Sequence, residues 1–136
     1  MKYFKVFILC SFFALVFGCV GIKASTASKV QLCVDKIEQG NFNRKIGYYT
    51  KNTGTAQHVL LEAARTSLTD PCTSCVIGFK LFMKDGTSFT GFSLTSGRSS
   101  YFNSDSAIPG EYKLGLMRAD FTMLKTTADI VWTINS

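Results

Sequence analysis

The stretch from Cys75 to Leu94 has the sequence of a β-hairpin, and it constrains the fold more than any other segment of the chain. Asp85 and Gly86 predict a two-residue type I′ turn, because both residue types tolerate the positive φ angles that this turn requires. Apolar and polar residues alternate on both sides of the turn, as they do in paired strands with one buried face. We therefore expect the chain to be built around antiparallel strands.

Pairing Lys84 with Thr87 across this turn sets the register of the whole hairpin. The pairs that follow are Met83–Ser88, Leu81–Thr90, Phe79–Phe92 and Ile77–Leu94 on one face, and Phe82–Phe89 on the other. The first face is mostly apolar and is expected to point into a core. The second face carries Lys80 and Lys84 beside the two phenylalanines, so we expect it to face water.

The N-terminal residues have the order of regions found in a secretory signal peptide. Lys2 and Lys5 precede an apolar run from Val6 to Val20, and small and polar residues follow the run. This run is shorter than the roughly 20 residues that a membrane-spanning helix needs. We therefore expect export of the protein rather than a retained membrane span.

Two processing sites are compatible with this signal. Residues 25–27 place small side chains at the two positions that a signal peptidase inspects, which predicts a signal peptide of residues 1–27 and a secreted domain of residues 28–136. Residues 16–19 are similar to a bacterial lipobox, although Phe17 is unusual there, so a lipid anchor at the cell surface through Cys19 is the alternative. Cleavage after residue 27 leaves 109 residues, enough for one domain, and lowers the formal net charge from +6 to +3.

The rest of the chain consists of short segments with strand-like alternation, separated by turn residues. Besides the hairpin of 75–94, we expect strands within 28–40, 45–51, 56–65, 99–103, 111–117 and 127–135. Segment 28–40 also has apolar residues at helical spacing, and segment 56–65 contains good helix formers, so a helix is the alternative in each. Seven or eight short strands, with a possible short N-terminal helix, predict an all-β protein folded as an antiparallel β-sandwich.

Alternation within these strands also places particular side chains on a common face. We expect the following residues to share a face within their strand: Ile46 with Tyr48, Val59 with Leu61 and Ala63, Tyr112 with Leu114 and Leu116, and Ile130 with Trp132 and Ile134.

Two turns give the chain a resemblance to a known type of domain. Lys84-Asp85-Gly86-Thr87 ends one strand, and Pro109-Gly110-Glu111-Tyr112 leads into a late strand with an inward tyrosine. With these two turns in this order, the sequence from Thr55 to Ile134 resembles the bacterial pre-peptidase C-terminal type of secreted β-domain. The cysteines of this chain are not part of that pattern. The resemblance implies an accessory or binding domain that has no catalytic residues.

Three cysteines remain after cleavage at residue 27, namely Cys33, Cys72 and Cys75. In an exported protein they predict a structural disulfide, either between Cys33 and one of the other two or directly between Cys72 and Cys75. A redox-active C-x-x-C would require a helix after the first cysteine, whereas a strand is expected here. A zinc site using Cys33 and His58 would lack the usual second close pair of ligands. We therefore expect no metal and no cofactor.

The residues suited to catalysis are few. His58 is the one histidine, and Glu62 follows it at a spacing that suits a base and its orienting carboxylate. No nucleophile elbow, no H-E-x-x-H motif and no phosphate-binding glycine loop occurs in the sequence. A hydrolase using His58 and Glu62 is thus a minor hypothesis, and we expect a protein that is not an enzyme.

Binding residues are expected in two places. Arg98, Tyr101 and Asn103 lie in a polar and aromatic loop of the kind that carries recognition at the end of a sandwich. Lys80, Phe82 and Phe89 form the outward face of the hairpin. The lysines and arginines are scattered along the sequence, which argues against nucleic acid as a partner.

The sequence therefore predicts a small secreted β-sandwich without catalysis, which binds an extracellular protein, a glycan or another component of a cell envelope. The alternative is a membrane-active, toxin-like β-protein that meets anionic lipid through the surface around Lys80, Phe82 and Phe89.

Overall fold

The computed structural model describes residues 28–52, 54–66, 71–120 and 125–135. The predicted signal peptide and Cys19 lie outside these residues. The described chain forms eight β-strands and one short 3-10 helix: β1 (Lys29–Ile37), β2 (Arg44–Lys51), β3 (His58–Arg65), β4 (Ile77–Met83), β5 (Phe92–Leu94), β6 (Ser99–Tyr101), η1 (Ser104–Ala107), β7 (Gly110–Arg118) and β8 (Thr126–Thr133). Every segment that was predicted as a strand contains one.

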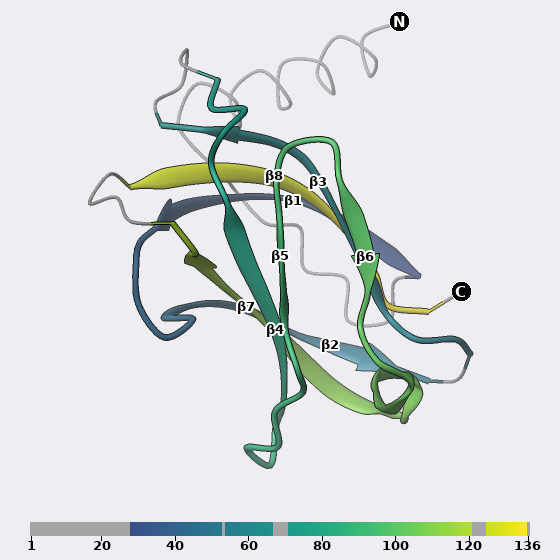
Figure 1. The fold of residues 1–136 in the computed structure, drawn as a ribbon. Helices are drawn as coiled ribbons and strands as arrows, with labels where there is room; N and C mark the ends of the chain where they lie inside the picture. Colours follow the sequence, from purple (N-terminus) through teal and green to yellow (C-terminus); the bar gives the residue numbers. More distant parts are fainter. Residues whose placement is uncertain (1–27, 53, 67–70, 121–124, 136) are drawn as a thin grey trace, which may run out of the picture.

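The strands form two antiparallel sheets of four (Figure 1). Sheet A has the order β1-β8-β3-β6, and sheet B has the order β2-β7-β4-β5. The first strand pairs with the eighth, the second with the seventh, the third with the sixth and the fourth with the fifth. The chain thus has the topology of one long hairpin folded over on itself. Its terminal strands β1 and β8 lie in sheet A, and the strands β4 and β5 at its closed end lie in sheet B. This order is that of an eight-stranded jelly roll, one of the β-sandwich architectures, and the predicted fold class is confirmed.

The core lies between the two sheets and is lined by alternate residues of nearly every strand. The predicted inward sets of β7 and β8 are confirmed, since Tyr112, Leu114, Leu116, Ile130, Trp132 and Ile134 are all buried. The Trp132 indole packs edge-on against Tyr49 and donates a hydrogen bond of 2.9 Å to Gln57 Oε1. Gln57 in turn donates to the backbone oxygen of Ser106, so a buried polar chain joins β8 to η1.

Segment 28–40 forms a strand, and the alternative of a short N-terminal helix is wrong. Val30, Leu32 and Val34 point into the core at the spacing of a strand, and the register with β8 then shifts before Ile37. Lys36 has a φ of 56° at this β-bulge, which brings Ile37 back to the buried side. The apparent helical spacing of this segment is therefore the combined result of a strand and a bulge.

Bulges also correct two of the predicted faces. In β2 the register with β7 shifts between Gly47 and Tyr49, so Tyr49 is buried while Tyr48 is exposed, and Tyr48 does not share the face of Ile46 as predicted. In β3 the shift falls between Leu61 and Ala63, and Ala64 rather than Ala63 reaches the core. One extra residue in a strand reverses every side chain beyond it.

The hairpin of β4 and β5 is confirmed, and its turn projects at the bottom of the view in Figure 1. Its turn is not the predicted type I′. Met83 N donates to Thr87 O, and Gly86 N donates to Met83 O, which leaves three residues in the loop. Gly86 alone among them has a positive φ, of 96°. This pattern is a type I turn that ends in a bulge, and it needs glycine only at its last position.

A second irregularity separates the turn from the end of the hairpin. Phe79 pairs with Phe92 as predicted, but Phe89 N donates to Leu81 O, so one extra residue lies between the two pairings. Gly91 occupies this bulge, where a Cβ atom would come within 2.3 Å of the Phe79 carbonyl oxygen. Phe89 therefore turns inward and packs against Tyr112, with 5.8 Å between the ring centroids.

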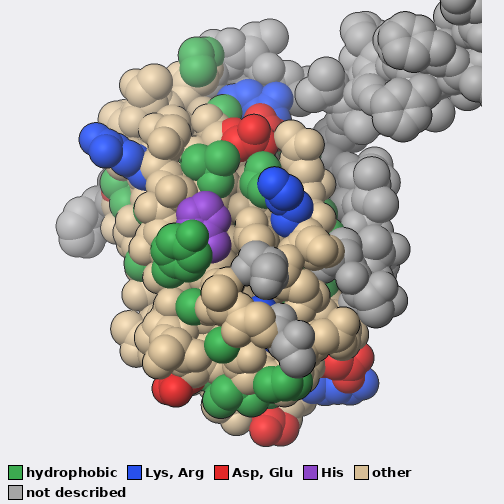
Figure 2. All heavy atoms as spheres, turned by 90° about the vertical axis from the view of Figure 1, so that its right-hand side faces the viewer, with side chains coloured by type: hydrophobic (Ala, Val, Ile, Leu, Met, Phe, Trp, Pro, Cys, Tyr) green, Lys and Arg blue, Asp and Glu red, His purple; other side chains and the backbone are tan. Residues whose placement is uncertain are grey.

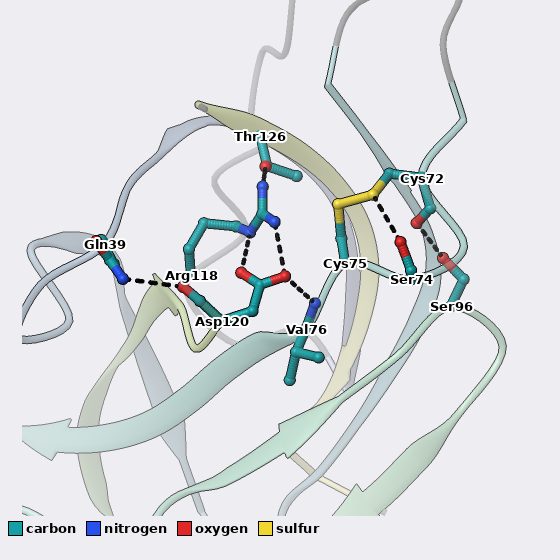
Figure 3. Close-up of polar contacts among 9 residues, drawn as sticks. All are labelled: Gln39, Cys72, Ser74, Cys75, Val76, Ser96, Arg118, Asp120 and Thr126. Atoms are coloured by element: carbon teal, nitrogen blue, oxygen red, sulfur yellow. Dashed lines mark hydrogen bonds and ion pairs between the residues drawn. A yellow bond between two sulfur atoms is a disulfide. The ribbon is translucent and has the colours of Figure 1, made fainter. Parts of the chain in front are cut away.

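One end of the sandwich is held by an ion pair between a buried arginine and a partly exposed aspartate (Figure 3). The Arg118 guanidinium donates to both carboxylate oxygens of Asp120, at 2.8 and 2.7 Å, and to the Thr126 hydroxyl. The Asp120 carboxylate also accepts a hydrogen bond from Val76 N. These bonds join the ends of three strands, and the hydrogen bonds from Arg118 lower the pKa of Asp120.

Candidate functional site: a basic and aromatic sheet face

The outer face of sheet B carries a cluster of lysines and aromatic rings. We call this cluster the basic–aromatic face; it consists of Lys45, Lys80, Lys84 and Lys113 with Phe42, Tyr48 and Phe82. Strands β2, β7 and β4 contribute all of these residues except Phe42, which comes from the connection between β1 and β2, and Lys84, which begins the turn after β4. The face is thus assembled from parts of the sequence that lie far apart.

Register explains why the lysines come together. Gly115 of β7 pairs with Lys45 of β2 on one side and with Lys80 of β4 on the other. Because neighbouring strands lie roughly 5 Å apart, the backbones of these two lysines are about 10 Å apart across the glycine. In the next outward row, Lys113 of β7 lies beside Phe82 of β4.

Each ring on this face has at least one lysine ammonium above it. Lys45 Nζ lies 4.7 Å and Lys80 Nζ 5.7 Å from the centre of the Phe82 ring. Lys113 Nζ lies 4.5 Å and Lys84 Nζ 5.5 Å from the centre of Tyr48. These cation–π contacts hold the lysine stems over the sheet without neutralising their charge.

The two phenylalanines lie close to the sheet because glycines lie beneath them. A Cβ atom on Gly115 would come within 2.6 Å of the Phe82 ring and 3.0 Å of Phe42 Cβ. A Cβ atom on Gly78 would lie 3.4 Å from the Phe42 ring. The rings of Phe42 and Phe82 meet edge to face, with 6.4 Å between their centroids. The face is therefore a low platform of rings and ammonium groups.

Charge on this face is largely uncompensated. The ion pairs of the described residues include one from this face, between Lys84 and Glu111 at 3.3 Å, and both of its side chains are exposed. Exposed pairs of this kind contribute about 0 to 1 kcal/mol. Four lysines against one glutamate leave a positive surface that suits a negatively charged ligand.

The structure brings together two of the predicted hairpin residues and separates the third from them. Lys80 and Phe82 belong to the basic–aromatic face. Phe89 does not face outward as predicted, because the bulge at Gly91 turns it into the core, where it is 8% exposed. A ring in that position packs the domain and is out of reach of a ligand.

The predicted loop residues lie elsewhere, on the side of the molecule that carries β6. Tyr101 is 65% exposed on β6 and packs against His58, with 4.6 Å between the ring centroids. Asn103 precedes η1, and its backbone oxygen accepts a hydrogen bond from Ser106. Arg98 lies at the end of the connection between β5 and β6. Figure 2 shows this side: the histidine lies against a hydrophobic side chain, and Lys and Arg side chains are spread over the surface.

His58 and Glu62 are engaged with different partners. The His58 ring packs against the Tyr101 ring at a tilt of 48°, and burial lowers the pKa of the His58 imidazole. The Glu62 carboxylate accepts a hydrogen bond of 3.0 Å from Gln31 Nε2 on β1. His58 and Glu62, the base and carboxylate of the hydrolase hypothesis, thus contact Tyr101 and Gln31 respectively.

Among the predicted disulfide pairings, the structure has the short one. Cys72 and Cys75 are bonded to each other, with 5.4 Å between their Cα atoms, and Cys33 takes no part in this bridge. Figure 3 shows the bridge beside the Arg118 and Asp120 pair. The residues Cys72 to Cys75 thus form a closed loop that leads into β4.

Four members of the basic–aromatic face were not predicted from the sequence, namely Phe42, Lys45, Tyr48 and Lys113. The outward positions of Lys45 and Lys113 are visible in the alternation of their strands. What the sequence does not show is that β7 lies between β2 and β4, and only this order places the lysines side by side.

The described residues hold neither a metal-binding group nor a membrane-spanning helix. Within residues 28–52, 54–66, 71–120 and 125–135, no three His, Cys, Asp or Glu side chains gather in a group that suits a metal ion. Over the same residues, no helix has the length and apolar character needed to cross a membrane.

Comparison with known proteins gives no family. No family model matches the sequence, and no curated protein matches it. A solved structure of Streptomyces albus HEPD with its substrate 2-hydroxyethylphosphonate and Fe(II) bound aligns with 80% of this chain, at 15% identity and a TM-score of 0.39. The alignment covers 19% of that protein, so this chain spans about a fifth of its length. A similarity this low supports no conclusion about function.

Proposed function

We propose that this protein is a small secreted β-sandwich without catalysis, which binds a negatively charged extracellular or envelope ligand through the basic–aromatic face. The observation that carries the proposal is the row of Lys45, Gly115 and Lys80 across three strands, with the Phe82 ring lying over the glycine. This arrangement presents positive charge and apolar surface together on a rigid sheet.

Secretion is supported by features outside this face. The N-terminal residues have the order of a signal peptide, and the Cys72–Cys75 bridge is of a kind that persists in oxidising compartments. A lipid anchor through Cys19 is the alternative mode of export. Intact mass spectrometry of the exported protein distinguishes the two, because it reads the mature N-terminus and any acyl chain directly.

The binding proposal is tested with a charge-matched pair of double variants. Lys45→Gln with Lys80→Gln removes two charges from the basic–aromatic face, and Lys29→Gln with Lys125→Gln removes two charges from outside it. The probes are polygalacturonate, polyphosphate and vesicles of phosphatidylcholine and phosphatidylglycerol in equal parts, with dextran and pure phosphatidylcholine vesicles as neutral controls.

We expect the wild type to bind at least one anionic probe, more weakly as salt is raised, because exposed charges are screened beyond about 8 Å at physiological ionic strength. The variant of the basic–aromatic face should lose this binding and the control variant should keep it. Equal loss in both variants, or binding to no anionic probe, contradicts the proposal.

A membrane-active, toxin-like protein is the second candidate, and the combination of lysines with aromatic rings is the observation that favours it. A dye-leakage assay on the phosphatidylglycerol vesicles separates the two functions. A binding domain releases no dye at concentrations that saturate the vesicle surface, whereas a membrane-active protein does.

A further inference from the structure

We propose that the ligand of the basic–aromatic face is an acidic polysaccharide, a chain of sugar rings that carry carboxylate or sulfate groups. This inference rests on the function proposed above and narrows it to one class of ligand. It follows from how lysines and half-buried aromatic rings are combined on the outer face of sheet B.

Charge on this face is spread rather than focused. Lys45 and Lys80 lie on opposite sides of β7, and Lys113 lies between them on β7 itself, in the neighbouring row. Lys45 and Lys84 are exposed, and Lys80 and Lys113 are half-buried, so solvent weakens the attraction of each single ammonium for an anion. A polymer with one negative group on each repeat contacts several of these lysines at once, and the contacts then reinforce each other through their high local concentration.

Aromatic rings alternate with the lysines. Phe82 lies between Lys45 and Lys80, and Tyr48 lies close to Lys113 and Lys84. An aromatic ring presents an electron-rich, apolar face, and the C–H faces of a sugar ring are its natural partners. A ligand in which apolar ring faces and negative groups recur along one chain matches this alternation, whereas a polyanion without sugar rings uses only the lysines.

The form of the face argues against a bilayer as the ligand. A protein that enters the membrane interface buries projecting apolar side chains by about 5 to 10 Å. Here Phe42 and Phe82 are half-buried and lie low over Gly78 and Gly115, and Tyr48 is the one large hydrophobic residue of this face that is exposed, at 37%. Such a face can lie on a charged chain, but it offers little to insert.

The test compares polygalacturonate, polyphosphate and the phosphatidylglycerol vesicles as ligands of the whole secreted protein, by biolayer interferometry. Tyr48→Ser removes the exposed ring without removing charge, and Lys45→Gln with Lys80→Gln removes charge without removing a ring. We expect the lysine variant to bind polygalacturonate about tenfold more weakly, which corresponds to about 1.4 kcal/mol. We expect Tyr48→Ser to weaken polygalacturonate binding several-fold and to leave polyphosphate binding unchanged.

The outcomes separate the inference from the proposed function. Binding to the vesicles but not to polygalacturonate overturns the inference and leaves the function standing. The inference is also overturned if the protein binds polygalacturonate and polyphosphate with equal affinity and Tyr48→Ser has no effect. The face would then recognise its ligand by charge alone. Binding to none of the three overturns both.

Discussion

Phe82 lies directly over Gly115 of the neighbouring strand, so that a methyl group on the glycine would come within 2.6 Å of the phenylalanine ring. Residue 115 has ordinary strand geometry, and alanine would otherwise be favoured there over glycine by about 0.5 to 1 kcal/mol. The absence of a side chain at this position is therefore what lets the ring come close to the sheet between Lys45 and Lys80.

We predict that Gly115→Ala lowers the free energy of unfolding by about 1 to 3 kcal/mol, the usual cost of overpacking, and weakens polygalacturonate binding. Urea denaturation measures the first effect. The double variant Gly115→Ala with Phe82→Ala tests the cause, since removing the ring removes the clash. The two substitutions should then be strongly non-additive, and simple additivity would show that the ring is not what the methyl group meets.

The Arg118 and Asp120 pair makes stability depend on pH in a definite direction. The hydrogen bonds from Arg118 lower the pKa of Asp120 in the folded protein below its unfolded value near 4. The stabilisation is therefore fully present above the unfolded pKa and is lost as the pH falls through the lowered one.

Asp120→Asn should lower the free energy of unfolding at neutral pH by about 2 to 3 kcal/mol, because the Arg118 guanidinium, 4% exposed, loses its counter-charge. The difference between the variant and the wild type should shrink when the denaturation is repeated in acid. A difference that stays constant from neutral pH to below the lowered pKa would show that the carboxylate charge does not matter.

Lys51 is buried where β2 ends, and its Nζ donates to the backbone oxygens of Thr55 and Ile134 at 2.8 and 2.7 Å. Burial lowers the pKa of its ammonium. We predict that Lys51→Met destabilises the domain by about 1 to 3 kcal/mol, because the buried carbonyl of Ile134 and the partly buried carbonyl of Thr55 lose a donor. Lys125→Met, at an exposed pair with Glu38, should stay within about 0.5 kcal/mol of the wild type and serves as the control in thermal denaturation.

The Cys72–Cys75 bridge closes a short loop, and its contribution should be correspondingly small. The chain-entropy relation gives about 2 kcal/mol for a loop of this size. The double variant Cys72→Ala with Cys75→Ala should therefore remain folded, with a lower midpoint in urea. Complete loss of the fold in this variant would mean that the bridge is needed for more than closing its own loop.

How far the sequence predicts this fold is illustrated by Tyr48 and Tyr49. Alternation located β2 correctly but placed Tyr48, instead of Tyr49, on the side of Ile46, because a bulge after Gly47 adds one residue to the strand. The same cause moved Phe89 inward and made β1 look partly helical. Strand position follows from local residue pattern, but a bulge depends on the fit between two strands that are distant in the sequence.

The candidate site was harder to predict than the fold, for a related reason. Lys80 and Phe82 were assigned correctly to an outward face, since β4 determines this on its own. Lys45 and Lys113 joined them only once β7 was known to lie between β2 and β4. A surface that is built across strands follows from the strand order, and a single sequence does not show that order.

The contrast between Phe82 and Phe89 provides a last test, because the sequence predicted one role for both. Phe89 is 8% exposed and packs against Tyr112, so Phe89→Ala should lower the free energy of unfolding by about 3 to 5 kcal/mol. Its folded fraction should bind polygalacturonate as the wild type does. Phe82→Ala should cost about 1 kcal/mol in stability and weaken the binding, since it removes the ring between Lys45 and Lys80. Urea denaturation measures the stability of the two variants, and biolayer interferometry measures their affinity for polygalacturonate. If Phe89→Ala reduced the affinity of the folded protein more than Phe82→Ala does, the assignment of Phe82 to the binding face and Phe89 to the core would be contradicted.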